Sequence, residues 1–335
     1  MTDMGWEGPK CFGSRFIECT LSSAVGFRIL LYYKFAPIDD PAAFAAVHLE
    51  MCQFLGLHGR IIVASEGING TASGPAESCE LYMRWLRRFP GFEDTVFKID
   101  ESAEHAFKAM HVRIRDEIIT LGEELDQPVW EKTGMHLSPV KWREMLQRDD
   151  VIILDGRNKY EADFGHFRNA VCPDLESFRE FPDWIRENLS QYRDKPILTY
   201  CTGGIRCEKL SAWMIEEGFE EVYQLDGGIV SYGKDAEAQG ELWDGTCYVF
   251  DDRMTVPINW TEDAVFITEC LHCGIKLDRT HKCRNVDCNQ LIVLCENCEA
   301  IHGQFCSPEC TEVQRMREQG QKLQADLRLK NLASK

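Results

Sequence analysis

Residues 201–206 carry the side chains that could do chemistry, in the order Cys201-Thr202-Gly203-Gly204-Ile205-Arg206. Residues 197–200 are apolar and favour a β-strand, and residues 209–217 have apolar side chains at helical spacing, so the segment is predicted to be a loop between a parallel strand and a helix. Its glycines let successive N–H groups turn toward the Cys201 sulfur, and the helix dipole adds positive potential. We therefore predict a Cys201 thiolate that acts as a nucleophile, a persulfide carrier or a redox centre.

The distance in sequence between Cys201 and Arg206 limits what this loop can hold. Cysteine phosphatases have a loop one residue longer, which encloses a tetrahedral phosphate, so the present cradle better suits a terminal sulfur. We expect Arg206 and the loop amides to hold the thiolate, and we expect the sulfur to be reachable from solvent. The residues that would form the wall of the cradle are Thr202, Gly203, Gly204 and Ile205. The alternative is a buried cysteine before a helix, without a catalytic role.

Ordered sequence anchors surround this loop. They are Val-Ile-Ile-Leu-Asp-Gly-Arg at residues 151–157, Tyr160-Glu161, Gly165-His166-Phe167, Asn169-Ala170 and Leu-Asp-Gly-Gly-Ile at residues 225–229. Together with the loop, these anchors resemble the rhodanese family. The resemblance implies a parallel α/β sheet with the cysteine loop at its carboxyl edge, where open parallel sheets collect functional groups.

Four further residues near the loop are candidates to support it or to react with Cys201. Asp155 and Arg157 lie at the end of the strand that opens the domain, and we expect Arg157 to tie the loop through a charge pair with Asp155 or with Glu161. His166 is interpreted as a fixed supporting residue. Cys207 could resolve an oxidised Cys201, but a packed helix residue whose side chain points away from the loop centre is favoured.

Eight cysteines within residues 270–310 form four short-spaced pairs. Short spacing lets two thiolates reach one ion, so four pairs make two tetrahedral sites of four thiolates. Two structural zinc ions are predicted, because so small and charged a segment would hardly fold without metal. An iron–sulfur cluster is the alternative, the pairing of the ligands stays open, and His272, His281 and His302 are possible substitutes. The predicted ligands are Cys270, Cys273, Cys283, Cys288, Cys295, Cys298, Cys306 and Cys310.

Composition places limits on compartment and partners. The chain has 335 residues, which suffices for two or three domains, and no apolar stretch approaches the roughly 20 residues that span a bilayer. Its 16 cysteines fit metal ligands and reactive thiols in a reducing compartment, so we expect a soluble, cytoplasmic protein without membrane contact. A formal net charge of −18 argues against broad nucleic-acid binding, so any RNA must meet a local basic patch.

The N-terminal third reads as a ferredoxin-like α+β domain. Strands are predicted at residues 26–35, 60–64, 97–100 and 112–121, with helices from Pro41, capped by Asp39 or Asp40, and over residues 77–89. Residues 66–71 are predicted to form a glycine-rich turn, either an anion-binding nest or a hairpin in which Asn69-Gly70 supplies positive φ angles. Possible RNA contacts are Asn69, Arg84, Arg87 and Arg88, although a solvated helix face is the commoner role for such arginines.

The predicted fold class is α/β, with a central rhodanese-like parallel-sheet domain, a ferredoxin-like domain before it and a Cys-rich zinc module after it. We place a leader, disordered or packed on later domains, at residues 1–24 and the ferredoxin-like domain at residues 25–122. A linker covers residues 123–136 and the rhodanese-like domain residues 137–246. The zinc module covers residues 247–335 and ends in a helix from Thr311.

The three parts in this order resemble a narrower family, the bacterial tRNA uridine hydroxylases. This resemblance extends from about residue 25 to about residue 315. It rests on Glu66-Gly67-Ile68-Asn69-Gly70-Thr71, the loop extended to Cys207-Glu208, Val249-Phe250-Asp251-Asp252-Arg253 and the cysteine-rich end. It implies that molecular oxygen is used to convert the wobble uridine in a tRNA anticodon loop to 5-hydroxyuridine, with Cys201 essential. Two alternatives remain: a sulfurtransferase that carries a Cys201 persulfide, and a noncatalytic RNA- or protein-binding scaffold.

Overall fold

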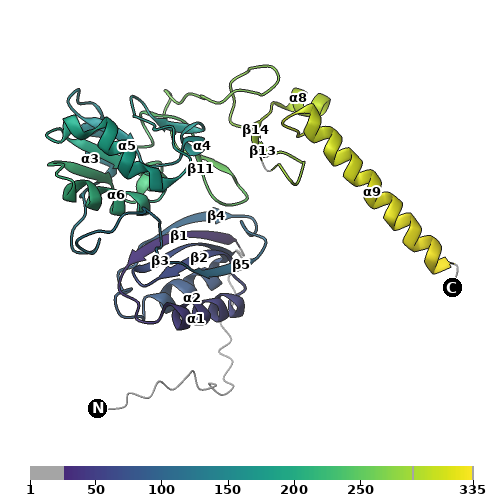
Figure 1. Ribbon diagram of the computed structural model, residues 1–335, viewed down its shortest axis with the longest axis horizontal. Helices are drawn as coiled ribbons and strands as arrows, with labels where there is room; N and C mark the ends of the chain where they lie inside the picture. The colour runs from purple at the N-terminus through teal and green to yellow at the C-terminus, as the bar shows by residue number, and fades with distance from the viewer. Residues whose placement is uncertain (1–25, 289, 334–335) are drawn as a thin grey trace, which may run out of the picture.

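The computed structural model describes residues 26–288 and 290–333 (Figure 1); the predicted leader lies outside this part. The N-terminal domain contains β1 (Phe27–Phe35), α1 (Pro41–Phe54), β2 (His58–Ala64), β3 (Gly67–Pro75), α2 (Ala76–Leu86), β4 (Phe97–Ser102) and β5 (Met110–Ile114). Its strand order is β4-β1-β3-β2-β5. The first four strands are antiparallel neighbours in the ferredoxin-like order, which confirms the predicted fold class, and β5 adds a strand parallel to β2.

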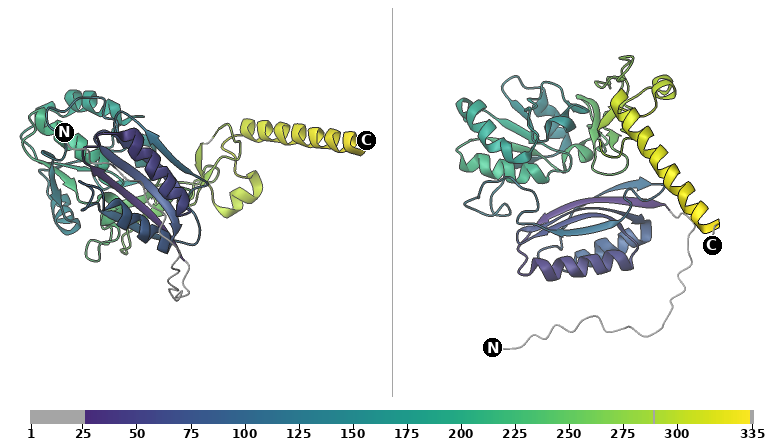
Figure 2. Two further views of the ribbon diagram at one scale, coloured as in Figure 1. Left: turned by 90° about the horizontal axis from the view of Figure 1, so that it is seen from below. Right: turned by 45° about the vertical axis from the view of Figure 1, so that its right-hand side comes forward.

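The two helices cover one face of this sheet, and the opposite face meets the next domain (Figures 1 and 2). Helix α1 begins where predicted because the Asp40 carboxylate accepts from the amides of Ala42 and Ala43, and Pro41 needs no amide partner at the first helical position. Side chains alternate along β1, so Leu30 and Tyr32 pack under the helices while Leu31 and Tyr33 face the second domain.

The predicted glycine-rich turn over residues 66–71 is wrong. Residues 67–71 lie within β3, and the turn from β2 comprises only Ser65 and Glu66. Gly70 is paired with Tyr32, and a β-carbon on it would lie 2.5 Å from the Tyr32 ring. The glycine therefore makes room for an aromatic ring inside a sheet, and it supplies no positive φ angle for a hairpin.

The second domain is built on a four-stranded parallel sheet. Its strands are β6 (Met135–Leu137), β7 (Ile152–Asp155), β9 (Ile197–Tyr200) and β10 (Val222–Leu225), in the order β6-β10-β9-β7. The helices are α3 (Pro139–Leu146), α4 (Lys159–Ala162), α5 (Phe181–Asn188), α6 (Ile205–Glu216) and α7 (Gly228–Tyr232), with short 3-10 turns at Phe178–Glu180 and Ser190–Tyr192. The cysteine loop joins β9 to α6 at the carboxyl edge of the sheet, as predicted.

The remaining elements follow the parallel sheet. Strands β8 (Gly165–Phe167), β11 (Trp243–Tyr248) and β12 (Thr255–Pro257) form a small antiparallel sheet. The C-terminal module has β13 (Thr280–Lys282), β14 (Leu291–Val293), α8 (Glu296–His302) and α9 (Pro308–Ala333), and α9 projects away from the other domains (Figure 2). None of the helices within the described residues has the length and apolar character needed to cross a bilayer.

Candidate active site and metal centre

The cysteine loop is wrapped around the Cys201 sulfur. The Gly204 amide donates to Cys201 Sγ at 3.2 Å, and Gly204 has a φ angle of 103°, which favours glycine at this position. The first amides of α7 hold the loop from outside, because Ile229 donates to the Cys201 carbonyl at 3.0 Å. Gly228 allows this contact, since a β-carbon there would lie 2.6 Å from the same carbonyl oxygen.

These contacts favour an ionised thiol. Burial alone would raise the pKa of Cys201, but hydrogen bonds from the Cys207 thiol and from the amides of Cys207 and Arg206, together with the charge of Arg206, lower it well below the ordinary thiol value. The pKa of Cys207 is raised by burial and by the neighbouring Cys201 charge. Cys201 is therefore the thiolate of the pair, and Cys207 is its hydrogen-bond donor.

The expected orientation of Cys207 is thus wrong, although Cys207 is fully buried as expected. Helix α6 begins at Ile205, four residues before the first clearly periodic position in the sequence. Cys207 consequently lies in the first helical turn, where its thiol reaches Cys201.

Two buried arginine–carboxylate pairs support the loop. The Arg206 guanidinium donates to both oxygens of Glu161, at 2.5 and 2.8 Å, so this arginine is fixed by a partner beyond the loop. Arg157 is paired with Asp155, at 2.9 and 2.6 Å, and not with Glu161; both members of that pair are fully buried. The Tyr200 hydroxyl also donates to Asp155, at 2.8 Å, which links this pair to the strand before the loop. Asp155 and Arg157 therefore lie beside the loop as structural groups.

His166 lies at the middle of β8 and is partly exposed. Its Nδ1 lies 3.3 Å from the carbonyl oxygen of Phe167 on the same strand. A supporting role for His166 at the cysteine loop stays a prediction.

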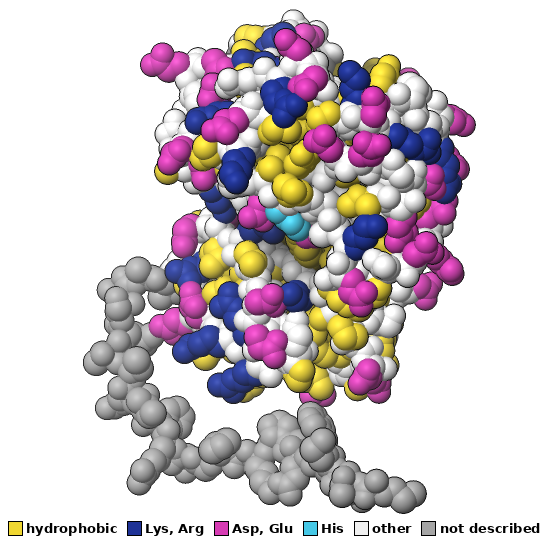
Figure 3. All heavy atoms as spheres, turned by 90° about the vertical axis from the view of Figure 1, so that its left-hand side faces the viewer, with side chains coloured by type: hydrophobic (Ala, Val, Ile, Leu, Met, Phe, Trp, Pro, Cys, Tyr) yellow, Lys and Arg dark blue, Asp and Glu magenta, His cyan; other side chains and the backbone are white. Residues whose placement is uncertain are grey.

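The cysteine loop is covered by the N-terminal domain. Cys201 is only 1% exposed, so the expectation of an open thiol is wrong for this conformation. A β-carbon on Gly203 would lie 3.0 Å from the Leu31 side chain, and one on Gly204 would lie 2.8 Å from the Tyr33 hydroxyl. Figure 3 shows the surface hollowed along the junction of the two domains. Substrate access to the sulfur therefore requires movement at this junction.

Polar contacts hold the junction together. The Tyr33 hydroxyl donates to Glu208 at 3.0 Å, and Lys209 pairs with Glu66 at 2.8 Å and with Glu117 at 2.5 Å. Asp100 of β4 pairs with Lys234 and, at 2.6 Å, with Arg253. Sequence reasoning missed the contact between Tyr33 and Glu208, because no local pattern shows which face of β1 meets the loop.

The four candidate RNA contacts do not meet the cysteine loop. The Asn69 side chain, on β3, donates to the carbonyl of Ile118 in the segment after β5, at 3.1 Å. Arg84, Arg87 and Arg88 are exposed at the end of α2, on the helix-covered side of the N-terminal sheet (Figure 1). Arg87 already donates to the Thr95 carbonyl, at 3.0 and 3.2 Å.

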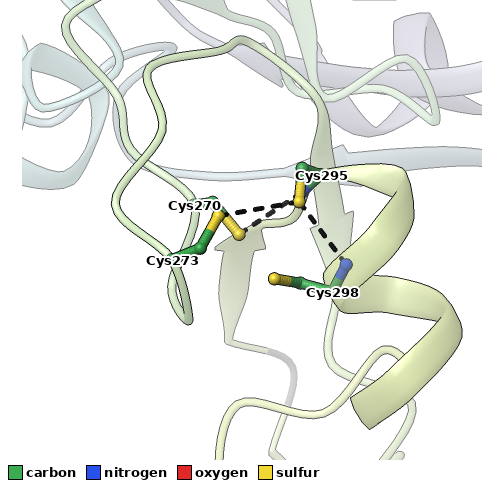
Figure 4. A group of neighbouring side chains, drawn as sticks. All are labelled: Cys270, Cys273, Cys295 and Cys298. Atoms are coloured by element: carbon green, nitrogen blue, oxygen red, sulfur yellow. Dashed lines mark hydrogen bonds between the residues drawn. The ribbon is translucent and has the colours of Figure 1, made fainter.

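The eight C-terminal cysteines form two groups of four that could each hold a metal ion. Within each group all sulfur atoms lie within 4.8 Å of one another. The groups are Cys270, Cys273, Cys295 and Cys298 (Figure 4), and Cys283, Cys288, Cys306 and Cys310. In the first group the Cys295 amide donates to Cys270 Sγ and the Cys298 amide to Cys295 Sγ, both at 3.4 Å. Converging sulfurs with amide donors suit a thiolate-bound metal, and the structure supplies the ligand pairing that spacing left open.

Three family models match the chain in the same order as the structural parts. They are the UPF0176 acylphosphatase like domain over residues 27–118, the rhodanese-like domain over residues 138–235 and the rhodanase C-terminal model over residues 244–311.

Curated relatives match nearly the whole chain. Proteins named tRNA uridine(34) hydroxylase are 53% identical in Bacillus licheniformis, over 85% of this chain and 88% of the relative, and 52% identical in Bacillus pumilus, over 86% and 89%. The Shouchella clausii protein of the same name is 52% identical, over 85% and 88%. The chain belongs to the tRNA uridine(34) hydroxylase family. This membership confirms the resemblance drawn from the sequence motifs. For a tRNA uridine(34) hydroxylase family member, the rhodanese-like model covers the cysteine loop, and the rhodanase C-terminal model covers the eight clustered cysteines.

Proposed function

We propose that the protein hydroxylates carbon 5 of the wobble uridine in a tRNA anticodon loop, in the cytoplasm, with Cys201 as nucleophile and molecular oxygen as co-substrate. The observation that carries the proposal is the match to relatives named tRNA uridine(34) hydroxylase at 52–53% identity over 85–86% of this chain and 88–89% of each relative. The lowered pKa of Cys201 supports the choice of nucleophile.

The chemistry needed is a two-electron oxidation of the uracil ring. The Cys201 sulfur adds to the electrophilic carbon 6, and the electron pair of the ring double bond moves toward carbon 5 and the carbonyl at position 4. Carbon 5 then takes an oxygen atom derived from molecular oxygen, whose second atom leaves as water with two electrons from a reductant. Loss of the proton from carbon 5 and departure of the thiolate from carbon 6 restore the double bond and free Cys201.

The loop residues have separate tasks in this scheme. The Gly204 amide and the Cys207 thiol stabilise the thiolate before attack and again when it leaves. Arg206, held by Glu161, supplies a fixed positive charge beside the sulfur. The target base must leave its stack to enter the junction, which is feasible in an anticodon loop because that RNA is single-stranded.

We also propose that the two cysteine groups bind zinc. All-sulfur tetrahedral sites are typical of structural zinc, and the sulfur positions suit one ion per group. The ions would fix β13, β14, α8 and the start of α9, whose described core is small. No step of the proposed reaction uses them.

Mass spectrometry of tRNA nucleosides tests the function. Cells that lack the protein should lose 5-hydroxyuridine or its derivatives, and the wild-type chain should restore them while Cys201→Ser should not. Equal restoration by Cys201→Ser would contradict the assigned nucleophile. An unchanged nucleoside profile, together with Cys201-dependent formation of thiocyanate from thiosulfate and cyanide, would support a sulfurtransferase instead.

A further inference from the structure

Lys98 of β4 places a positive charge beside the cysteine loop. Its ammonium lies 4.9 Å from the centroid of the Tyr33 ring, and its Cε would lie 3.4 Å from a β-carbon on Gly227. Burial lowers the pKa of Lys98 to about 8, opposed by the negative charges of Cys201, Asp226 and Glu208. No hydrogen bond or ion pair links the ammonium to the rest of the described chain, so its donors are free for a ligand.

Lys98 also lies between two cavities. The larger, of about 360 Å³, opens at the junction of the two domains, and the smaller, of about 40 Å³, reaches Thr202 of the cysteine loop. Lys98 lines both of them, so its side chain is shared by the open pocket and by the cavity that reaches the loop.

The walls of the larger pocket suit a flat, polar ring. Phe35 and Trp130 contribute aromatic surface, and Trp130 is 47% exposed, as expected for a ring that has no protein partner covering it. Asp226 contributes a carboxylate acceptor near the Lys98 donor. The Glu208 oxygens are already occupied by donors of the chain itself, which are Tyr33, His136, Thr133 and Gln224. The volume is near the lower end of the roughly 300–1,000 Å³ range of small-molecule pockets, so the pocket has room for one nucleoside.

We propose that this pocket binds the unstacked uracil and that Lys98 donates from Nζ to the carbonyl oxygen at position 4. The proposal rests on the proposed function and names the residue that reads the base. Uracil presents carbonyl acceptors and one N–H donor, which match an ammonium and a carboxylate. Cytosine presents an amino group in place of the carbonyl at position 4. The Lys98 ammonium and this amino group are both hydrogen-bond donors, so they could not bond to each other.

Such a contact has a consequence for reactivity. The ring gains negative charge when the Cys201 sulfur adds to it, and a cation already bonded to its carbonyl oxygen stabilises that charge without reorganisation. The N-terminal domain would then supply a substrate-contacting residue to a site whose nucleophile lies in the rhodanese-like domain.

Binding of anticodon stem-loop RNA to the full-length chain tests the proposal. Three RNAs are compared by fluorescence anisotropy, with uridine, cytidine or an abasic residue at the wobble position, and Cys201→Ser is used as background to prevent turnover. Lys98→Met should weaken binding of the uridine RNA about ten- to hundred-fold, the loss expected for a hydrogen bond to a charged group, and should leave the abasic RNA unchanged. Lys98→Arg keeps the donor and should restore part of the loss.

Lys108→Met is the matched control, because Lys108 is an exposed lysine of the same domain that lines neither cavity. It should bind all three RNAs like the background protein. If Lys98→Met lowers the affinity for all three RNAs equally, Lys98 contacts the phosphate backbone and the proposal is overturned. The proposal is also overturned if Lys98→Met leaves the affinity unchanged while it melts like the background protein. If base-dependent binding through Lys98 is found while the wild-type chain forms no 5-hydroxyuridine, the pocket stands and the proposed reaction fails.

Discussion

Replacing Glu161 by Gln tests whether a buried charge pair holds the catalytic loop. Glu161 is fully buried, and its two oxygens accept from Arg206 at 2.5 and 2.8 Å. Gln has the same shape, but it removes the negative charge and turns one acceptor into a donor that faces the guanidinium. Arg206 would then lose its hydrogen-bonded counter-charge, and only the Cys201 thiolate would remain beside it. Breaking such a pair costs about 3–5 kcal/mol of unfolding free energy.

The expected change is large enough to measure by heating. For a domain of about 110 residues, an unfolding entropy of about 2.1 cal/mol/K per residue makes each kcal/mol worth about 4 °C, so the loss corresponds to a fall of about 13–22 °C in the melting temperature of the rhodanese-like domain. Calorimetry would follow it, and nucleoside analysis below the melting range would report whether activity falls as well.

Asp150→Asn provides the matched control. Asp150 also accepts two bonds from one arginine, Arg148, at 2.8 and 2.7 Å, but the two side chains are 57% and 46% exposed. Water and salt screen this pair, so its removal should leave the melting temperature unchanged within error. If the Glu161 and Asp150 variants melt alike, burial does not set the strength of the pair, and the argument for a fixed Arg206 fails.

Three further predictions follow from the site. Hydrogen bonds and the charge of Arg206 lower the pKa of Cys201, so the Cys201 thiolate should persist at pH values well below the ordinary thiol pKa of about 8.5. The thiolate absorbance of the wild-type chain minus that of Cys201→Ser measures this, and it should vanish only as the pH falls through the lowered pKa. A transition at about pH 8.5 would contradict the stabilisation of the thiolate by the loop. Asp100→Asn should speed alkylation of Cys201, read by peptide mass spectrometry, because Asp100 ties the covering domain to Lys234 and Arg253; an unchanged rate would show that those pairs do not limit access. Metal analysis should find two zinc ions per wild-type chain and one fewer in Cys273→Ser, and a full complement in that variant would contradict the assigned ligands.

Local pattern was sufficient to find the cysteine loop and the cysteines that the structure gathers into two groups of four. The start of the loop follows from the four-residue apolar strand before Cys201, but its end was predicted two residues too late, because α6 already begins at Ile205. The cysteine groups are equally local, since short spacing alone identifies the pairs. The combination of two pairs in one site depends on β13, β14 and α8, and spacing does not determine how these pack.

Contacts between residues that are far apart in the sequence could not be predicted in the same way. The Asn69-Gly70 pair has the composition of a hairpin turn, but the tertiary requirement of the Tyr32 ring places it inside β3. Burial of Cys201 depends on Leu31 and Tyr33, which lie far from it in sequence. Lys98 gives no signal of its own, because one lysine in a short strand normally indicates an exposed position.

The arrangement of the cysteine groups has a consequence for assembly. Cys283 and Cys288 belong to one group but lie between the two halves of the other, which joins Cys273 to Cys295. Binding of either ion would therefore fix part of the chain that connects the ligands of the other group. Closing the second loop would then cost less conformational entropy than closing the first. The two ions should therefore bind cooperatively. A chain that ends before Cys310 would lack one ligand of the group that contains Cys283, and the group that contains Cys270 would lose the stabilisation that the other ion provides.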